Sequence, residues 1–143
     1  MNRAIDYTKR CPECGAPEAN GLGCFGQLGE ILTWEYDDPE LLSQHFWTVA
    51  CYTIQHPAQF TAEAMAKFQE VFCQAYDQQL PLGEIRKRVS FFAQGKAKVV
   101  KKSLHRPVYR EWAMTISEVY LVGERKGAAD RVRAWSKIVR KQM

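Results

Sequence analysis

The chain has 143 residues, a length that suits one folded domain with one hydrophobic core. Its apolar content of 46% and charged content of 25% are ordinary for a globular protein and exclude a collagen-like, coiled-coil or disordered chain. No apolar run reaches the roughly 18 residues that a membrane helix needs, and residues 1–10 lack the apolar segment of a secretory signal. We therefore expect a cytoplasmic protein with no membrane partner, whose cysteines stay reduced.

The net charge of +4 is divided unevenly along the chain. Residues 1–82 carry 4 Lys/Arg and 11 Asp/Glu, a net charge of −7, whereas residues 83–143 carry 16 and 5, a net charge of +11. This asymmetry fits an anionic partner for the basic half, either nucleic acid or another protein, and it equally fits two halves that face each other. The cations we expect to contact a polyanion are Lys96, Lys98, Lys101, Lys102 and Arg106.

Three of the five cysteines lie in the segment CPECGAPEANGLGC. Cys11 and Cys14, with two residues between them and Gly15 after them, form half of a structural zinc site. Cys24 is a natural third ligand, because a helix is predicted to begin there and a helix N-terminus lowers the pKa of a thiol. Residues 1–24 therefore predict a metal-knuckle loop that lacks its fourth ligand, with free thiols on a mobile loop as the alternative.

Apolar residues at three- and four-residue steps predict a first helix over residues 24–36. Asp38 is suited to cap a second helix, with Pro39 in its first turn. This second helix should end before Pro57, because a proline disfavours helix in the residue that precedes it.

A third helix is expected over residues 61–80 and a fourth over residues 82–94, which would stop at Gly95. Thr115 and Glu118 have the spacing of a capping box. The last helix, residues 129–143, should bury Val132, Trp135, Ile138 and Val139. The fold class is thus mainly α: a single-domain bundle of about six helices, residues 1–143, led by the zinc-knuckle loop 1–24. Its further parts are a helical core over residues 25–94, a basic loop over residues 95–114 and C-terminal helices over residues 115–143.

Geometry ranks the candidates for the fourth metal ligand, which are His45, His56, Cys51, Cys73 and His105. If the first two helices form an antiparallel hairpin, Cys24 lies about 18 Å from the bend and His56 about 24 Å, whereas His45 lies only about 8 Å from it. We therefore expect Cys11, Cys14, Cys24 and His56 to bind one zinc ion, with His45 as the alternative fourth ligand. Otherwise His45 is a hydrogen-bonded core residue, Cys51 and Cys73 are buried free cysteines, and His105 is exposed.

The order of these residues resembles an uncharacterised bacterial family, one of the domains of unknown function. Its pattern of Cys-x-x-Cys-Gly, Cys-aromatic, Asp-Pro and His-x-x-Thr-Val-x-x-Tyr-x-x-Gln-His-Pro stands here as Cys11, Cys14, Gly15, Cys24, Phe25, Asp38, Pro39, His45, Thr48, Val49, Tyr52, Gln55, His56 and Pro57. The tail also matches at residues 115–119 and 132–135, although Glu118 replaces a frequent Asp and a His near Ala128 is missing. The resemblance implies the metal site but no established activity. Because it includes both histidines, a second hypothesis places a polar pocket for a small ligand around His45, Tyr52 and Gln55.

The leading functional hypothesis is a non-catalytic, zinc-stabilised helical module that binds a macromolecular partner. Three thiolates and one imidazole form a closed tetrahedral site, which leaves no position for a substrate water. The competing hypothesis is a zinc-dependent enzyme in which His56 does not bind and the open position activates water, with Glu13 or Glu30 as the base. The sequence contains no His-Glu-x-x-His helix, Walker loop or dinucleotide glycine motif. The oligomeric state is left open.

Overall fold

The computed structural model describes residues 4–93 and 107–143. They form two compact units, one made of the residues up to Gln55 together with Val108–Met143, the other made of the residues from His56 to Pro107. The chain is mainly α-helical, as predicted, and adds a small sheet of two strands. None of the helices in these ranges combines the length and the apolar character needed to cross a bilayer. The single-domain organisation stays a prediction.

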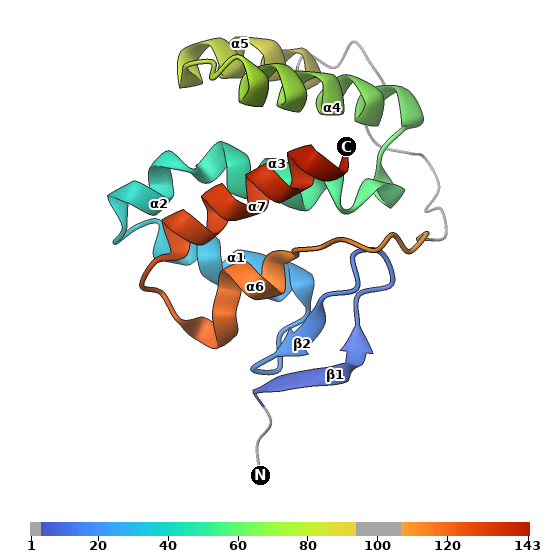
Figure 1. Cartoon of the computed structure of the whole chain (residues 1–143), viewed down its shortest axis with the longest axis vertical. Helices are drawn as coiled ribbons and strands as arrows, with labels where there is room; N and C mark the ends of the chain where they lie inside the picture. Colours follow the sequence, from blue (N-terminus) through green and yellow to red (C-terminus); the bar gives the residue numbers. More distant parts are fainter. Residues whose placement is uncertain (1–3, 94–106) are drawn as a thin grey trace. The chain divides into compact units, whose positions relative to one another are not determined.

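Helices dominate both units, and Figure 1 shows the order of the elements along the chain. The first unit contains β1 (Ile5–Arg10), β2 (Pro17–Ala19), α1 (Cys24–Trp34), α2 (Pro39–Ser43), α3 (His45–Ile54), α6 (Ile116–Tyr120), the 3₁₀ helix η2 (Leu121–Gly123) and α7 (Ala128–Gln142). The second unit contains the 3₁₀ helix η1 (Pro57–Gln59), α4 (Ala62–Asp77) and α5 (Leu82–Ala93).

The N-terminal segment is an antiparallel hairpin, where the sequence predicted only a loop over residues 1–24. Ile5 pairs with Ala19 and Arg10 pairs with Pro17, with a shift of register between them. The metal knuckle is the connection between the two strands. The strands were missed because β1 has mostly polar and exposed side chains, so it lacks the alternation of apolar residues that marks a half-buried strand.

Helix α1 begins at Cys24 and buries one face, as the periodicity predicted. Gln27, Leu28, Ile31 and Trp34 are its buried residues, and their spacing is that of a single helix face. The buried Gln27 joins α1 to the hairpin, because its Nε2 donates to the carbonyls of Pro17 and Leu22 at 2.9 Å each.

The predicted second helix is divided into α2 and α3. Asp38 caps α2, accepting a bond from the backbone N–H of Leu41 at 3.0 Å, and Pro39 occupies the first turn, as expected. The helix is interrupted at Gln44, whose φ of −96° and ψ of 7° depart from helical geometry. Nothing in the sequence marked this break, since residue 44 is neither Gly nor Pro. Helix α3 then ends at Ile54, before Pro57, as predicted.

Helices α1 and α3 run antiparallel, which confirms the hairpin assumed from the sequence. At one end, Cys24 Sγ of α1 lies 3.5 Å from the hydroxyl of Tyr52 in the last turn of α3. At the other end, Glu35 at the close of α1 lies 2.7 Å from Nδ1 of His45, the first residue of α3. The two histidines of this segment therefore belong to opposite ends of the helix pair.

The segment after residue 107 contains no helix or strand until α6. The predicted capping box is present, with the backbone N–H of Thr115 donating to Glu118 at 2.9 Å. Helix α6 ends after five residues, because Leu121 and Val122 have left-handed φ values of 46° and 55°. The guanidinium of Arg131 stabilises this turn by donating to the carbonyls of Val119, Glu124 and Lys126.

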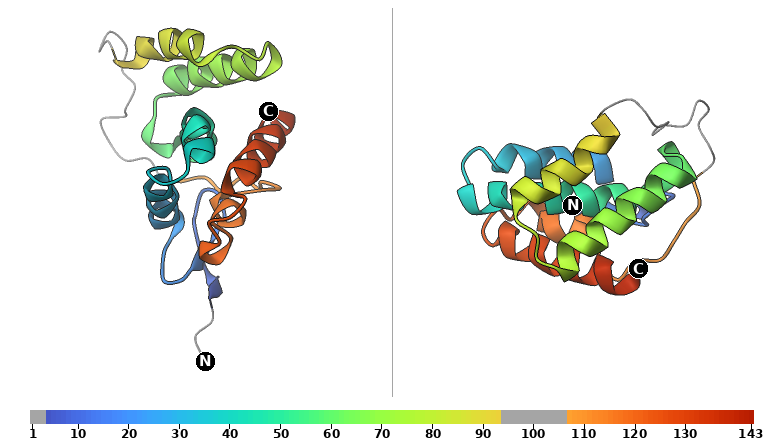
Figure 2. Two further views of the ribbon diagram at one scale, coloured as in Figure 1. Left: turned by 90° about the vertical axis from the view of Figure 1, so that its left-hand side faces the viewer. Right: turned by 90° about the horizontal axis from the view of Figure 1, so that it is seen from above.

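The core of the first unit lies where α7 packs against α3 and α6, and the left view of Figure 2 shows these elements. Val132, Trp135 and Val139 of α7 are fully buried, as predicted, whereas Ile138 is only half-buried. The carbonyl of Met114 accepts two bonds in this core, from Trp135 Nε1 at 3.1 Å and from Gln55 Nε2 at 2.8 Å.

The second unit is a helical hairpin. Thr61 caps α4 through a bond from the backbone N–H of Ala64, and α4 packs against α5. Phe72 and Ile85 are buried, and Met65 is nearly so, whereas Phe68 and Tyr76 are half-buried. The predicted stop at Gly95 and most of the basic loop 95–114 lie outside the described residues.

Candidate metal centre

The loop between β1 and β2 directs backbone N–H groups at two cysteine sulfurs. Cys11 Sγ accepts from the N–H of Glu13 at 3.4 Å and from that of Cys14 at 3.5 Å, and Cys14 Sγ accepts from the N–H of Ala16 at 3.4 Å. Such bonds favour the thiolate form that binds metals. The sequence Cys-x-x-Cys-Gly produces this geometry because Gly15 adopts a left-handed φ of 79°.

Gly15 is required for a second reason. A Cβ at this position would lie 2.8 Å from the ring carbon Cε2 of Tyr109. The aromatic ring therefore packs directly against the knuckle backbone, and it comes from the far end of the sequence. Backbone bonding supports the same contact, because the N–H of Arg110 donates to the carbonyl of Glu13 at 3.1 Å.

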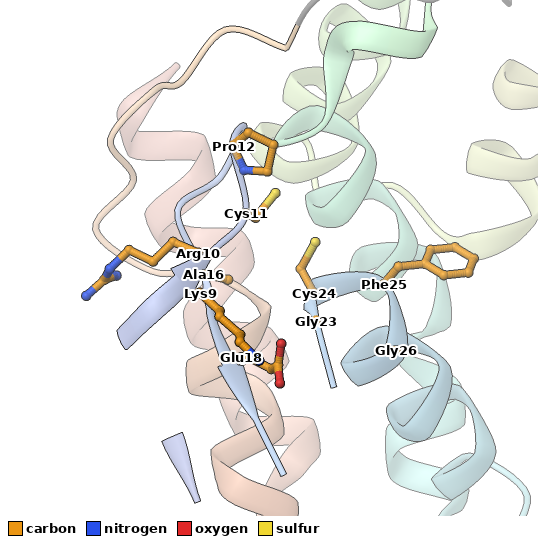
Figure 3. Close-up of a pocket in the computed structure, with 10 residues that line it drawn as sticks. All are labelled: Lys9, Arg10, Cys11, Pro12, Ala16, Glu18, Gly23, Cys24, Phe25 and Gly26. Carbon is orange, nitrogen blue, oxygen red and sulfur yellow. The ribbon is translucent and has the colours of Figure 1, made fainter. Parts of the chain in front are cut away.

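Cys24 approaches the knuckle from the first turn of α1. Figure 3 shows the side chains of Cys11 and Cys24 close to each other, with the ring of Phe25 turned away from them. Tyr52 of α3 lies beside Cys24. Burial raises the pKa of the Tyr52 phenol, and the neighbouring Cys24 thiol raises it further. The phenol therefore keeps its proton and donates to the sulfur when Cys24 is a thiolate.

His56 completes a cluster of four ligand atoms. One ring nitrogen of His56 and the sulfurs of Cys11, Cys14 and Cys24 all lie within 4.8 Å of one another. His56 directly follows Gln55, the C-cap of α3, so its backbone is attached to the end of that helix. Gln55 is itself fixed by its buried bond to Met114. These are the four residues chosen from the sequence as metal ligands.

The cluster crowds three thiols in a partly buried place. The neighbouring Cys11 and Cys24 thiols, and then burial, raise the pKa of Cys14 above its ordinary value. Three thiolates at such distances repel one another unless a cation lies between them. Three sulfurs and one imidazole nitrogen are the donor set that structural zinc sites use. The residues present therefore fit a metal ion.

A cavity of about 440 Å³ opens beside the cluster (Figure 3). Cys11, Cys24 and Phe25 contribute to its wall, together with Lys9 and Arg10 of β1. The guanidinium of Arg10 is directed elsewhere, since it donates to the carbonyl of Gly15 and lies over the ring of Tyr7. Cys11 and Cys24 thus line this cavity, whereas Cys14 is buried.

The remaining ligand candidates lie elsewhere. His45 is bonded to Glu35 at the other end of the α1–α3 pair. Cys51 is fully buried in α3, and burial raises the pKa of its thiol. Cys73 is a free, half-buried cysteine of α4. His105 lies outside the described residues, as do Lys96, Lys98, Lys101, Lys102 and Arg106, the cations expected to contact a polyanion.

The three residues assigned to a polar pocket face different partners. His45 bonds to Glu35, Tyr52 lies against Cys24, and the Gln55 amide donates to Met114. Glu35 was not singled out in the sequence, because it stands among the acidic residues of the segment WEYDDPE and resembles part of a solvated turn. Its buried carboxyl and its contact with His45 become visible only in the structure.

Of three comparisons with known proteins, one identifies a family to which the chain is similar. A search of curated proteins and a search of solved structures each gave no match. Residues 9–143 match the model of a family described as "Family of unknown function (DUF5946)". This agrees with the resemblance inferred from the cysteine and histidine motifs. The match spans nearly all of the chain, and the protein therefore belongs to this family of unknown function.

Proposed function

We propose that Cys11, Cys14, Cys24 and His56 bind one Zn²⁺ per chain as a structural site. The observation that carries this proposal is that their four ligand atoms all lie within 4.8 Å of one another. Tetrahedral zinc with Zn–S bonds of about 2.3 Å holds its sulfur ligands about 3.8 Å apart, so only a small contraction of the cluster is needed. Soft thiolate ligands favour zinc over magnesium or calcium.

The ion would join three separate pieces of the fold. Cys11 and Cys14 lie in the hairpin loop, Cys24 begins α1, and His56 follows the end of α3. Coordination of one ion by ligands from these three pieces would stabilise a short hairpin whose strands bury few apolar side chains. Metal binding and folding of the N-terminal segment are then coupled.

Four protein ligands leave no position for a substrate, so the proposed function is that of a non-catalytic module. A zinc-dependent enzyme is the second candidate, and the cavity beside Cys11 and Cys24 is the observation that favours it. An enzyme needs an open position that activates water. The coordination number of the bound ion separates the two candidates.

The module is proposed to bind a macromolecular partner through its basic C-terminal half. This proposal is supported by the net charge of +11 over residues 83–143. Lys137 and Lys141 stand one turn apart and exposed on α7, and the sequence adds Lys101 and Lys102. Clustered cations attract polyanions such as nucleic acid.

The zinc proposal is tested by metal analysis of protein purified without added metal. We expect one zinc per chain in the wild type, and loss or marked weakening of zinc binding in His56→Ala. His45→Ala is the matched control, because it removes a histidine from the same helix segment and should keep the metal. Zinc that is retained unchanged in His56→Ala contradicts the ligand set.

The partner proposal is tested by fluorescence anisotropy with a labelled RNA oligonucleotide. Binding should weaken with salt, with a slope of about −0.7 per neutralised phosphate for a single strand. The pair Lys101→Gln and Lys102→Gln should reduce that slope, while Lys67→Gln in the acidic half serves as the control. Absence of binding at low salt, or binding that does not respond to salt, contradicts this proposal for nucleic acid.

A further inference from the structure

A buried carboxylate holds one ring nitrogen of His45, at the end of the α1–α3 pair remote from the cysteines. Nδ1 of His45 lies 2.7 Å and 3.1 Å from the two carboxyl oxygens of Glu35. The side chain of Glu35 is 7% exposed and that of His45 is 53% exposed. The pair therefore has a buried acceptor and a solvent-facing ring.

This bond determines the form of the imidazole. A carboxylate only accepts, so the proton of the neutral ring stands on Nδ1, and Nε2 carries a lone pair. None of the described residues bonds to Nε2. Burial raises the pKa of the Glu35 carboxyl, an effect that the bond to His45 opposes. The ring thus offers a positioned acceptor that residues 4–93 and 107–143 do not use.

The pair opens into a cavity of about 420 Å³. Its other walls are Leu32, Tyr36 and Leu42, and both Tyr36, at 90%, and Leu42, at 55%, leave large apolar surfaces exposed. Apolar and aromatic walls around a single oriented polar group are typical of small-molecule sites. The volume lies near the lower end for such sites, which suits a molecule of one or two rings.

The charges around the cavity select against an anion. Within the part of the chain that the structure describes, its wall contains no Lys or Arg. Asp37 and Asp38 directly follow Tyr36, and the guanidinium of Arg125 forms an ion pair with Asp37. A carboxylate or phosphate would meet like charges without a compensating cation, so a neutral ligand is favoured.

We propose that this cavity binds a small, neutral, planar molecule of the phenol class, whose O–H donates to Nε2 of His45. Glu35 acts as a positioning residue, because its carboxyl fixes the His45 ring and its tautomer through Nδ1. The aromatic ring of the ligand would lie against Tyr36 and Leu42. The site is separate from the metal centre and does not depend on zinc being bound there.

The experiment is an NMR titration of the full, zinc-supplemented chain with 4-methylphenol, observed at the imidazole nitrogens. Its methyl ether, 4-methylanisole, is the matched probe, since it keeps the ring but lacks the donor. We expect saturable shifts of His45 Nε2 with 4-methylphenol and about tenfold weaker binding of the ether, the value of one good hydrogen bond. The signals of His56 should remain unchanged.

Variants separate this role from a structural one. His45→Gln should abolish the saturable binding while the chain keeps its fold and its zinc. Glu35→Ala should weaken the binding of 4-methylphenol about tenfold, because the proton of the neutral His45 ring is then no longer fixed on Nδ1. Glu35→Gln should restore part of the affinity. The proposal is overturned if the phenol does not bind saturably, if phenol and ether bind equally, or if His45→Gln leaves binding unchanged.

Discussion

The carbonyl oxygen of Met114 accepts two hydrogen bonds, and these allow a test of how the end of α3 is fixed beside the cysteines. Gln55 and Trp135 donate to this one oxygen from α3 and α7. Gln55 is 1% exposed, Trp135 0% and Met114 8%. A carbonyl at such a place needs at least one donor, because solvent does not reach it. Either donor alone meets that need. The effects of removing the Gln55 donor and the Trp135 donor on the free energy of unfolding should therefore not be additive.

The magnitudes follow from this geometry. Gln55→Met removes one hydrogen bond while the Met114 carbonyl keeps the other, from Trp135. This change should lower the free energy of unfolding by about 1 kcal/mol. Trp135→Phe removes the second bond and part of a fully buried ring, for about 2 kcal/mol. The double variant also leaves the carbonyl without a donor, which adds about 1–3 kcal/mol. The total loss should therefore reach roughly 4–6 kcal/mol.

The assay is urea unfolding followed by far-ultraviolet circular dichroism, at a fixed excess of zinc so that metal linkage is constant. A coupling free energy above about 1 kcal/mol supports the shared acceptor. Gln27→Met combined with Trp135→Phe is the control, since Gln27 bonds to Pro17 and Leu22 instead, and this pair should be additive. If Gln55→Met and Trp135→Phe are additive within about 0.5 kcal/mol, the reasoning is refuted.

Three further predictions concern the knuckle, the turn before α7 and the buried carboxyl. Gly15→Ala forces a Cβ against the ring of Tyr109 at a left-handed φ, so the free energy of unfolding in urea should fall by about 1–3 kcal/mol. Gly29 lies on α1 with open space around it, and Gly29→Ala, the control, should raise the free energy of unfolding by up to about 1 kcal/mol. Arg131→Ala removes bonds to three carbonyls and should lower the thermal midpoint by about 5–10 °C, at a cost of about 2–3 kcal/mol. Because the pKa of Glu35 is raised in the folded state, folding favours its protonated form, and stability is lost as the pH rises from about 4 through that raised pKa. The free energy of unfolding of Glu35→Gln, measured by urea unfolding, should therefore rise relative to that of the wild type as the pH rises over this range. A difference between the two that does not change with pH would contradict the burial of an ionising carboxyl.

The metal cluster is the part of the site that the sequence predicted best. Cys-x-x-Cys-Gly is a local motif, so Cys11 and Cys14 are close whatever the rest of the chain does. The sequence predicted His56 because two helices joined by a capped proline turn place residues at similar distances from the turn, to within about one helical turn, side by side. Both placements depend only on short-range geometry, and the structure brings these residues together.

The parts that were missed depend on contacts between distant segments. Tyr109 packs on Gly15, and Gln55 bonds to Met114, across separations that no local pattern reveals. The break at Gln44 has no proline or glycine to mark it. Strand β1 was missed because its pairing with β2 rests on backbone bonds, and its side chains are mostly polar.

The most direct measurement of the central claim is X-ray absorption at the zinc edge, on protein purified without added metal. We expect one zinc per chain with three sulfur neighbours at about 2.3 Å and one nitrogen at about 2.0 Å, with the outer-shell scattering of an imidazole. His45→Ala should leave this spectrum unchanged, whereas His56→Ala should remove the imidazole signal. A chain that binds no zinc, or a zinc ion with two or fewer sulfur neighbours and no imidazole, would contradict the Cys3His site.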